Sequence, residues 1–195
     1  MANTKKFDRE KVLESSMNLF WEKGYQATST RDLQQVTALK PGSLYSSFTN
    51  KETLLSEALQ RYTQMLEDCL VSCKTAQDNP LDALKDFVTR TLLDADNPPS
   101  YLCFIGKTRI ELNNSELAHI SDIPFEKTGK WFYDIFSQAQ TMGFLSDKEA
   151  PEQHVKRFQT RFFGWRGYLE INRDKPFIAQ EIEEYFSAFQ AQKPD

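Results

Sequence analysis

Residues 29–51 read STRDLQQVTALKPGSLYSSFTNK, and the pattern of this stretch decides the fold of the first part of the chain. It predicts two short helices joined by a tight turn, followed at once by a third helix that opens on Lys51. Ser29 is placed to cap the first helix, and Asp32 three residues later supplies the acid of a capping box. Pro41 falls in the first turn of the second helix, where an N–H would be unpaired in any case.

The second of these helices has two faces of different character. Leu44 and Phe48 are four residues apart, so they are expected to be buried on one face. The other positions carry small or hydroxylated side chains, namely Gly42, Ser43, Tyr45, Ser46 and Ser47. So few long charged side chains suit a helix that approaches another surface closely. A short helix braced by its neighbours is also the element that enters the DNA major groove in helix-turn-helix proteins.

Helical periodicity continues through the rest of the chain. Leu13, Met17 and Phe20 fall on one face of a helix expected at 8–23, and Gly24 follows as its end. Further helices are expected at 50–75, after Pro80, and at 102–112, 124–141, 151–172 and 176–191. No alternating strand pattern or hairpin signal accompanies them. The protein is therefore predicted to be all-α, with the helix at 50–75 linking a head (residues 1–66) to a body (residues 67–195).

The composition limits the class of protein. With 195 residues, 39% of them hydrophobic and 13% aromatic, the chain can bury a sizeable core. No apolar run approaches the roughly 20 residues needed to span a bilayer, and the start MANTKKFDRE lacks the apolar segment of a signal peptide. Three cysteines without zinc-type spacing favour reduced thiols over a disulfide framework. The protein is expected to be soluble and cytoplasmic, without a membrane partner.

Charge is unevenly distributed along the chain. The net charge is −4, but residues 1–61 hold nine Lys/Arg and seven Asp/Glu, whereas the remaining residues hold fifteen and twenty-one. A mildly basic head on an acidic body is the distribution that a separate DNA-binding head would show. Ordinary variation in surface charge explains the same numbers, so this asymmetry is supporting evidence only.

The sequence offers little for an enzyme. It contains no glycine-rich phosphate loop after a strand, no Gly-x-Ser-x-Gly elbow and no Cys-x-x-Cys pair. Its two histidines, His119 and His154, lack the spacing of a metal site or a catalytic triad. No enzymatic activity, cofactor or metal is expected. The alternative to a DNA-binding protein is an all-helical module that binds a protein partner through its aromatic body.

The order and spacing of several residues in the head are specific to one family. These residues are Phe20, Gly24-Tyr25, Thr28-Ser29, Gly42-Ser43-Leu44-Tyr45, Phe48, Asn50-Lys51-Glu52 and Leu54-Leu55. In this arrangement the first 66 residues resemble the DNA-binding head of TetR/AcrR-family transcriptional regulators. The resemblance implies a helix-turn-helix DNA-binding domain at 1–66 and a helical effector-binding and dimerisation domain at 67–195. It further implies a homodimer that represses transcription from a palindromic double-stranded operator and is released by a small-molecule or thiol-reactive effector bound in the body.

The resemblance assigns roles to individual positions of the head. Tyr45 resembles the tyrosine that reaches a phosphate, and Lys51 resembles the lysine that also holds the DNA backbone. The residues expected to contact DNA are Thr28, Thr30, Arg31, Lys40, Pro41, Gly42, Ser43, Tyr45, Ser46, Ser47 and Lys51, with Lys5 and Lys6 adding electrostatic attraction. Taken singly, Tyr45 and Lys51 are equally well explained as a core side chain and a solvated cation.

Two departures from the family pattern affect these assignments. Lys40 stands where the family usually has a capping Ser or Thr, so a weaker helix cap and an added cation near the DNA are expected. Ser46 and Ser47 stand where larger ring-bearing or basic residues are frequent. The base preference of the family is therefore not transferred to this chain.

The body is expected to hold an effector pocket for a small hydrophobic or electrophilic molecule. Its candidate lining residues are mostly aromatic: Phe87, Cys103, Phe104, Trp131, Phe132, Phe136, Phe162 and Trp165. The alternative explanation, which is favoured for most of them, is packing between helices.

Cys103 precedes a short helix that carries Lys107 and Arg109. A helix N-terminus and nearby cations favour a reactive thiol. The resemblance adds a branch of the family that senses electrophiles or oxidants with a cysteine in a similar place. The favoured alternative is a small buried residue.

Gly164 and Gly167 lie in the predicted helix at 151–172. Each lowers helix propensity by roughly 1 kcal/mol relative to alanine. Such glycines are tolerated where two backbones approach each other. They favour a dimer interface built from the last two helices.

Overall fold

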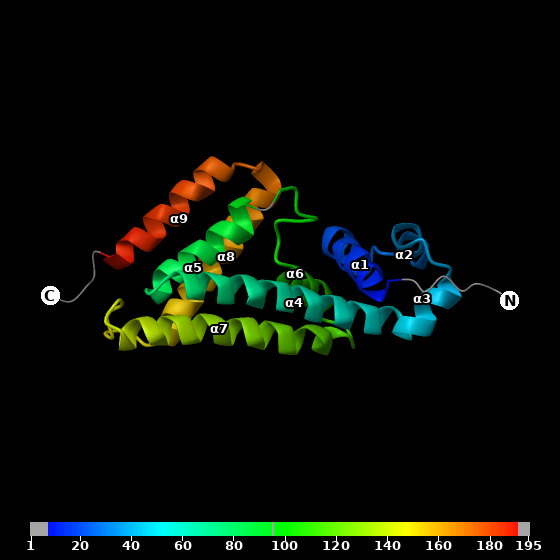
Figure 1. The fold of residues 1–195 in the computed structure, drawn as a ribbon, viewed down its shortest axis with the longest axis horizontal. Helices are drawn as coiled ribbons and strands as arrows, with labels where there is room; N and C mark the ends of the chain where they lie inside the picture. Colours follow the sequence, from blue (N-terminus) through cyan, green and yellow to red (C-terminus); the bar gives the residue numbers. More distant parts are fainter. Residues whose placement is uncertain (1–7, 95, 191–195) are drawn as a thin grey trace. The chain divides into compact units, whose positions relative to one another are not determined.

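The computed structural model describes residues 8–94 and 96–190, and within them every regular element is a helix (Figure 1). The all-α prediction is confirmed. The α-helices are α1 (Arg9–Lys23), α2 (Thr30–Thr37), α3 (Pro41–Phe48), α4 (Lys51–Ala76), α5 (Pro80–Thr89), α6 (Phe104–Leu112), α7 (Asp122–Thr141), α8 (Pro151–Asn172) and α9 (Lys175–Gln190). A π-helical turn, η1 (Arg90–Asp94), continues α5, and a 3-10 turn, η2 (Ala118–Ser121), precedes α7. Lys5 and Lys6 lie outside the described residues.

The chain divides into two compact units, and α4 contributes to both. The first unit runs to Gln64 and includes Phe104–Pro124, and the second holds Met65–Cys103 and the residues from Phe125 onward. The segment Phe104–Pro124, which contains α6, thus packs with the N-terminal helices although it is distant from them in sequence. Among the described helices, none is both long enough and apolar enough to cross a bilayer.

Local signals set the ends of the first helices. Asp8 caps α1 by accepting from the backbone N–H of Glu10 and Lys11, and Gly24 ends it at φ 88°, a conformation that favours glycine. Ser29 and Asp32 form the predicted capping box of α2, because the Ser29 hydroxyl accepts from the Asp32 N–H at 3.1 Å and the Asp32 carboxylate accepts from the Ser29 N–H at 2.8 Å.

The turn between α2 and α3 is made without glycine. Ala38 takes the left-handed conformation there, with φ 55°. Lys40 then occupies the N-cap position of α3 and makes no side-chain cap hydrogen bond, as its side chain predicts, while Pro41 is the first helical residue. The short α3 is therefore held mainly by what it buries.

An aromatic cluster forms the core of the second unit. Phe132 lies 4.8 Å from Phe158 and 6.3 Å from Phe162, and Phe87 lies 6.4 Å from both Phe132 and Phe162, measured between ring centroids. All four rings are buried. Burial of each such side chain contributes roughly 1.5–3 kcal/mol, so this cluster is a main source of cohesion between α5, α7 and α8.

Candidate nucleic-acid interface

The two faces of α3 differ as the sequence predicts. Leu44 and Phe48 are both 0% exposed and anchor the helix in the core of the first unit. The other face is open to solvent, where the exposed residues are Pro41, Gly42, Ser43 and Ser46, with Tyr45 and Ser47 partly exposed. Apart from Tyr45 these side chains are short, and a Cβ built at Gly42 would meet nothing within 4 Å. A second surface can therefore approach the backbone of α3 closely.

Tyr45 connects α3 to the beginning of α2. Its hydroxyl lies 3.1 Å from the hydroxyl of Thr30, the first residue of α2, and either group can donate. The Tyr45 ring is partly buried, whereas Thr30 is exposed. The pair places two hydroxyl groups at the surface beside the open face of α3, in a position suited to a phosphate oxygen.

Lys51 is held against the loop that follows α1. Its ammonium donates to the Tyr25 carbonyl at 2.6 Å and lies 4.1 Å from the centre of the Tyr25 ring. Burial lowers the pKa of Lys51, and the carboxylates of Glu111 and Glu52 oppose that shift. Because an ammonium has three N–H donors, the bond to Tyr25 leaves it able to donate to a phosphate as well.

Thr28 has a structural position that conflicts with its predicted contact to DNA. Its side chain is 1% exposed, and its hydroxyl donates to the Gly24 carbonyl at 2.6 Å. It closes the end of α1 and is not available to a ligand. Arg31, on α2, and Lys40, at the N-cap of α3, are in contrast exposed cations.

Two residues of α6 bind the end of α1 and the loop after it. From the sequence, Lys107 was expected only as a cation near Cys103, and Glu111 was not identified. The Glu111 carboxylate accepts from the backbone N–H of Tyr25 at 3.0 Å and of Gln26 at 2.7 Å. Lys107 donates to the carbonyls of Trp21 and Glu22, at 2.8 and 2.7 Å, in the last turn of α1. We call this arrangement, Lys107 and Glu111 bound to residues 21–26, the α6 brace.

The α6 brace satisfies both kinds of backbone group that a helix end leaves unpaired. The ammonium neutralises the carbonyl end of α1, and the carboxylate binds the amides that follow it. Lys107 and Glu111 are four residues apart and so lie on one face of α6. That spacing is the only local signal for the pair, and it is equally typical of a solvated helix.

Most of the residues expected to line an effector pocket have packing partners among the described residues, and their role in binding an effector stays a prediction. Phe87, Phe132 and Phe162 pack against one another in the aromatic cluster of the second unit. Phe104 belongs to the first unit, where it packs edge-on against Tyr62 at 5.7 Å. Phe136 and Trp165 are buried as well, and Trp131 is partly exposed, with the Lys127 ammonium 5.5 Å from its ring. Helix packing therefore accounts for most of these residues.

The cations expected beside Cys103 have other partners. Lys107 belongs to the α6 brace, and Arg109 donates to the Asp122 carboxylate at 2.7 Å. Cys103 is partly exposed, so a reagent can reach it, and its role as a sensor stays a prediction. For the other two thiols, burial raises the pKa, that of Cys73 to about 12, which makes them poor candidates for a reactive site.

Comparison with known proteins relates this chain to bacterial regulators. Residues 12–58 match the family of bacterial regulatory proteins named for tetR. The HTH-type transcriptional repressor ComR of Escherichia coli (strain K12) is 50% identical over 58 residues, which are 30% of this chain and 28% of ComR. The uncharacterized HTH-type transcriptional regulator YuxN of Bacillus subtilis (strain 168) is 30% identical over 96% of this chain and 74% of its own length.

Solved structures agree in fold over nearly the whole chain. A cysteine mutant of the TetR family transcriptional regulator CifR, complexed with a 26-base-pair double-strand operator DNA, superimposes with a TM-score of 0.83 at 19% identity. The alignment covers 95% of this chain and 99% of that one. At this identity the likeness concerns the fold.

Proposed function

The chain belongs to the TetR family of bacterial regulatory proteins, whose members are transcription regulators and not enzymes, and we propose that it represses transcription by occupying a double-stranded operator as a homodimer. The observation that carries this proposal is the open face of α3. Apart from Tyr45 this face carries short side chains, while Leu44 and Phe48 fix the helix from behind. A helix of this kind enters the major groove with its N-terminal residues toward the base edges.

The groups around α3 suit the DNA backbone. Tyr45 and Thr30 supply hydroxyl donors, and Lys51 supplies a cation at the N-terminus of α4, where the helix dipole also favours a phosphate. Arg31 and Lys40 add exposed positive charge. Phosphate contacts fix the position of a protein on the duplex, and the residues at the open face of α3 then read the bases. In a homodimer the two α3 helices would meet successive major-groove faces about 34–36 Å apart.

The dimer is proposed to form through α8 and α9. A Cβ built at Gly164 or Gly167 would meet nothing within 4 Å, so the backbone of α8 is open to close approach there. Ile171 on the same helix is 81% exposed, and Phe163 and Tyr168 are exposed as well. Exposed apolar side chains beside open glycines are typical of a surface that a second subunit covers.

Release from DNA is proposed to follow binding of an effector in the second unit. An effector shifts the protein between two states only if it binds one of them more tightly. The α6 brace offers a route by which such a shift reaches the DNA-binding surface. Because Glu111 and Lys107 hold residues 21–26 directly, a displacement of α6 moves the loop that sets the position of α2.

Selection of bound sequences from a random duplex pool tests the proposal. A palindromic sequence should be enriched, and affinity for it should fall steeply as salt rises, because phosphate contacts release counterions. A Ser43→Ala variant should shift the enriched bases without changing stability, since Ser43 is exposed. The absence of any DNA binding at low salt would contradict the proposal and favour the protein-interaction module.

A further inference from the structure

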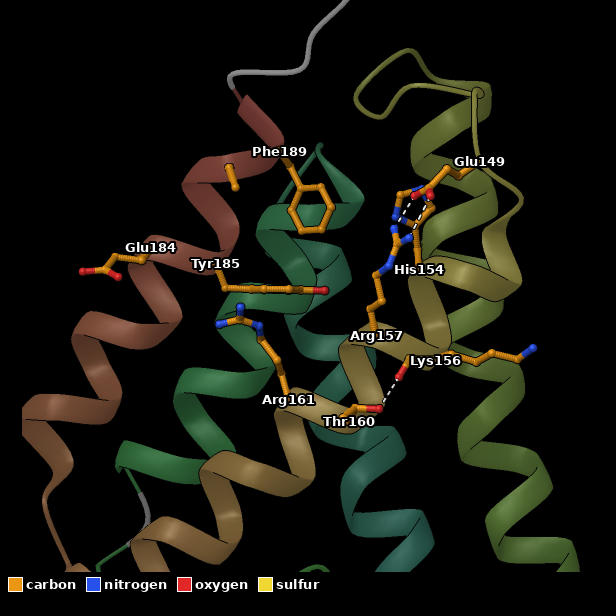
Figure 2. Close-up of a pocket in the computed structure, with 10 residues that line it drawn as sticks. Glu149, His154, Lys156, Arg157, Thr160, Arg161, Glu184, Tyr185 and Phe189 are labelled. Atoms are coloured by element: carbon orange, nitrogen blue, oxygen red, sulfur yellow. Dashed lines mark hydrogen bonds and ion pairs between the residues drawn. The ribbon is translucent and has the colours of Figure 1, made fainter.

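A cleft lies between α8 and α9, the same two helices that carry the proposed dimer face, and it is separate from the open face of α3 and from the α6 brace. Its volume is about 750 Å³, within the range of small-molecule sites. Its walls combine ionic and aromatic side chains from the two helices and the segment before α8: Glu149, His154, Lys156, Arg157, Thr160, Arg161, Glu184, Tyr185, Ala188 and Phe189 (Figure 2). None of these residues belongs to the effector pocket expected from the sequence.

His154 lies in the wall of this cleft and has a buried polar atom without a partner. The side chain is 7% exposed, stacks on Phe136 at 5.6 Å and meets Phe189 edge-on at 6.2 Å. Its Nε2 has no hydrogen-bond partner among the described residues, and the nearest carboxylate oxygen, on Glu149, is 3.9 Å away. A buried polar atom without a partner is destabilising, so a ligand that supplies the partner gains affinity.

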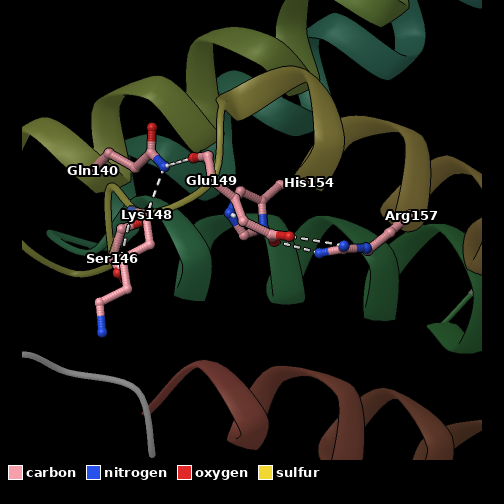
Figure 3. A network of polar contacts seen from close by, with 6 residues as sticks. All are labelled: Gln140, Ser146, Lys148, Glu149, His154 and Arg157. Carbon is pink, nitrogen blue, oxygen red and sulfur yellow. Dashed lines mark hydrogen bonds and ion pairs between the residues drawn. The ribbon is translucent and has the colours of Figure 1, made fainter.

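Glu149 does not supply that partner because it is fixed in another direction. Both of its oxygens accept from the Arg157 guanidinium, as Figure 3 shows. Its backbone carbonyl accepts from the Gln140 amide at 2.7 Å, and the same amide donates to the Ser146 carbonyl at 2.9 Å. The Arg157 guanidinium therefore binds the Glu149 carboxylate, while the Gln140 amide fixes the Glu149 backbone.

The opposite side of the cleft presents donors beside aromatic faces. Figure 2 shows the phenol of Tyr185 extending from α9 toward α8, with Phe189 above it and Arg161 below it. The Arg161 guanidinium lies 5.4 Å from the Tyr185 ring centre and 3.6 Å from the Glu181 carboxylate. Burial raises the pKa of Tyr185 to about 12, so its hydroxyl keeps its proton and can donate at neutral pH.

We propose that the cleft between α8 and α9 binds an organic carboxylate. Its carboxylate group would accept from His154 Nε2, the Tyr185 hydroxyl and Arg161, and its apolar body would lie against Phe189 and Ala188. The donors favour an anion, and the rings favour one with an apolar body over an inorganic ion. Binding itself does not depend on DNA, whereas its use as an effector site rests on the proposed function.

Calorimetric titration of the full chain with 1-naphthoate tests this proposal. We expect one molecule to bind per chain, at least tenfold more tightly than 1-naphthalenemethanol, which has the same rings without the charge. Inorganic phosphate should not compete. Equal binding of the alcohol, or competition by phosphate, would overturn the assignment to an organic carboxylate. If no naphthoate binds, the proposed site is wrong. This outcome includes the case in which a second subunit fills the cleft.

Two substitutions locate the binding. His154→Phe keeps a ring stacked on Phe136 but removes Nε2, and Arg161→Gln removes the guanidinium. Each should weaken naphthoate binding at least tenfold, while Lys130→Gln, at an exposed position of α7, should leave it unchanged. Thermal unfolding of the His154→Phe variant verifies that the fold is intact. Unchanged affinity in both cleft variants would place the ligand elsewhere.

Duplex binding by the same protein samples separates the two proposals. If naphthoate binds and the enriched DNA sequence does not, the carboxylate site stands and the repressor function fails. If DNA binds and naphthoate does not, the repressor function stands and the carboxylate site fails. If both bind, naphthoate should lower DNA affinity in the wild type and have no effect on the His154→Phe variant.

Discussion

The Glu111 carboxylate accepts a 2.7 Å hydrogen bond from the backbone N–H of Gln26, a residue 85 positions earlier in the chain. Its other oxygen accepts from the N–H of Tyr25, whose carbonyl in turn accepts from Lys51. Tyr25 therefore links the Glu111 carboxylate on α6 to Lys51, the cation proposed to contact the DNA backbone. The glycine at position 24 leaves room for this carboxylate, because a Cβ added there would lie 3.0 Å from a Glu111 oxygen.

Replacing Glu111 by alanine tests this relationship. Two backbone N–H groups lose their acceptor, so the free energy of unfolding should fall by about 1–3 kcal/mol. Amide hydrogen exchange at residues 25 and 26 should accelerate, and DNA affinity should fall because α2 is less well positioned. The matched control is Glu116→Ala, an exposed acid in the same unit. Equal exchange rates in the wild type and the Glu111→Ala variant would show that the carboxylate does not hold the loop.

Tyr45→Phe separates the packing of Tyr45 from its hydroxyl. The ring remains, so the melting temperature should change little. The contact with Thr30 and the proposed phosphate contact are both lost, so DNA affinity should fall by about 0.5–1.5 kcal/mol. Fluorescence anisotropy with the selected operator measures the change. Tyr133→Phe, at an exposed position of α7, is the control, and an equal effect of the two substitutions would contradict the proposed contact.

Lys51→Gln tests the proposed backbone contact through salt dependence. Loss of one phosphate contact should lower the slope of log affinity against log salt concentration by about one and weaken binding similarly for all sequences. Stability should fall too, because the bond to the Tyr25 carbonyl is lost. Lys74→Gln, in the last turn of α4, is the control. A variant that is less stable but has an unchanged salt slope would assign Lys51 to structure alone.

The sequence predicts features that depend on neighbouring residues. The capping box of Ser29 and Asp32 and the end of α1 at Gly24 each follow from side chains within about four positions. The burial of Leu44 and Phe48 follows from helical spacing alone. These local rules were sufficient to predict the helices and the open face of α3.

Contacts between distant segments were not predictable in the same way. The left-handed Ala38 has no local signal, because a glycine would be the expected residue there. Glu111 meets Gln26 only once α6 has packed on the first unit, and no spacing in the sequence encodes that meeting. The role of aromatic residues such as Phe132 was not predictable either, because composition does not distinguish a ring packed between helices from one that lines a cavity.

Ile171→Glu tests the proposed dimer face. Ile171 is 81% exposed in a single chain, so a charge there should leave the free energy of unfolding of the isolated chain within about 0.5 kcal/mol. In a dimer that covers Ile171, the buried charge should shift the protein to monomers.

Sedimentation at micromolar concentration measures the mass. Glu152→Gln, on the exposed side of α8, is the control. A wild type that is already monomeric at this concentration would remove the dimer from the proposed function.

His154 gives the stability of the second unit a dependence on pH. Burial is the largest cause that lowers the pKa of His154, Arg157 lowers it further, and the Glu149 carboxylate opposes both. A base whose pKa is lower in the folded state binds fewer protons there than in the unfolded chain. The free energy of unfolding should therefore be largest above the ordinary histidine pKa of 6.5 and decrease as the pH falls through and below it.

Urea unfolding at pH 7.5 and 5.5 measures this difference in the free energy of unfolding. It should shrink in the His154→Phe variant and persist in His119→Gln, whose histidine is exposed. If the His154→Phe variant lost as much stability as the wild type between these pH values, the buried imidazole would not be the group that titrates.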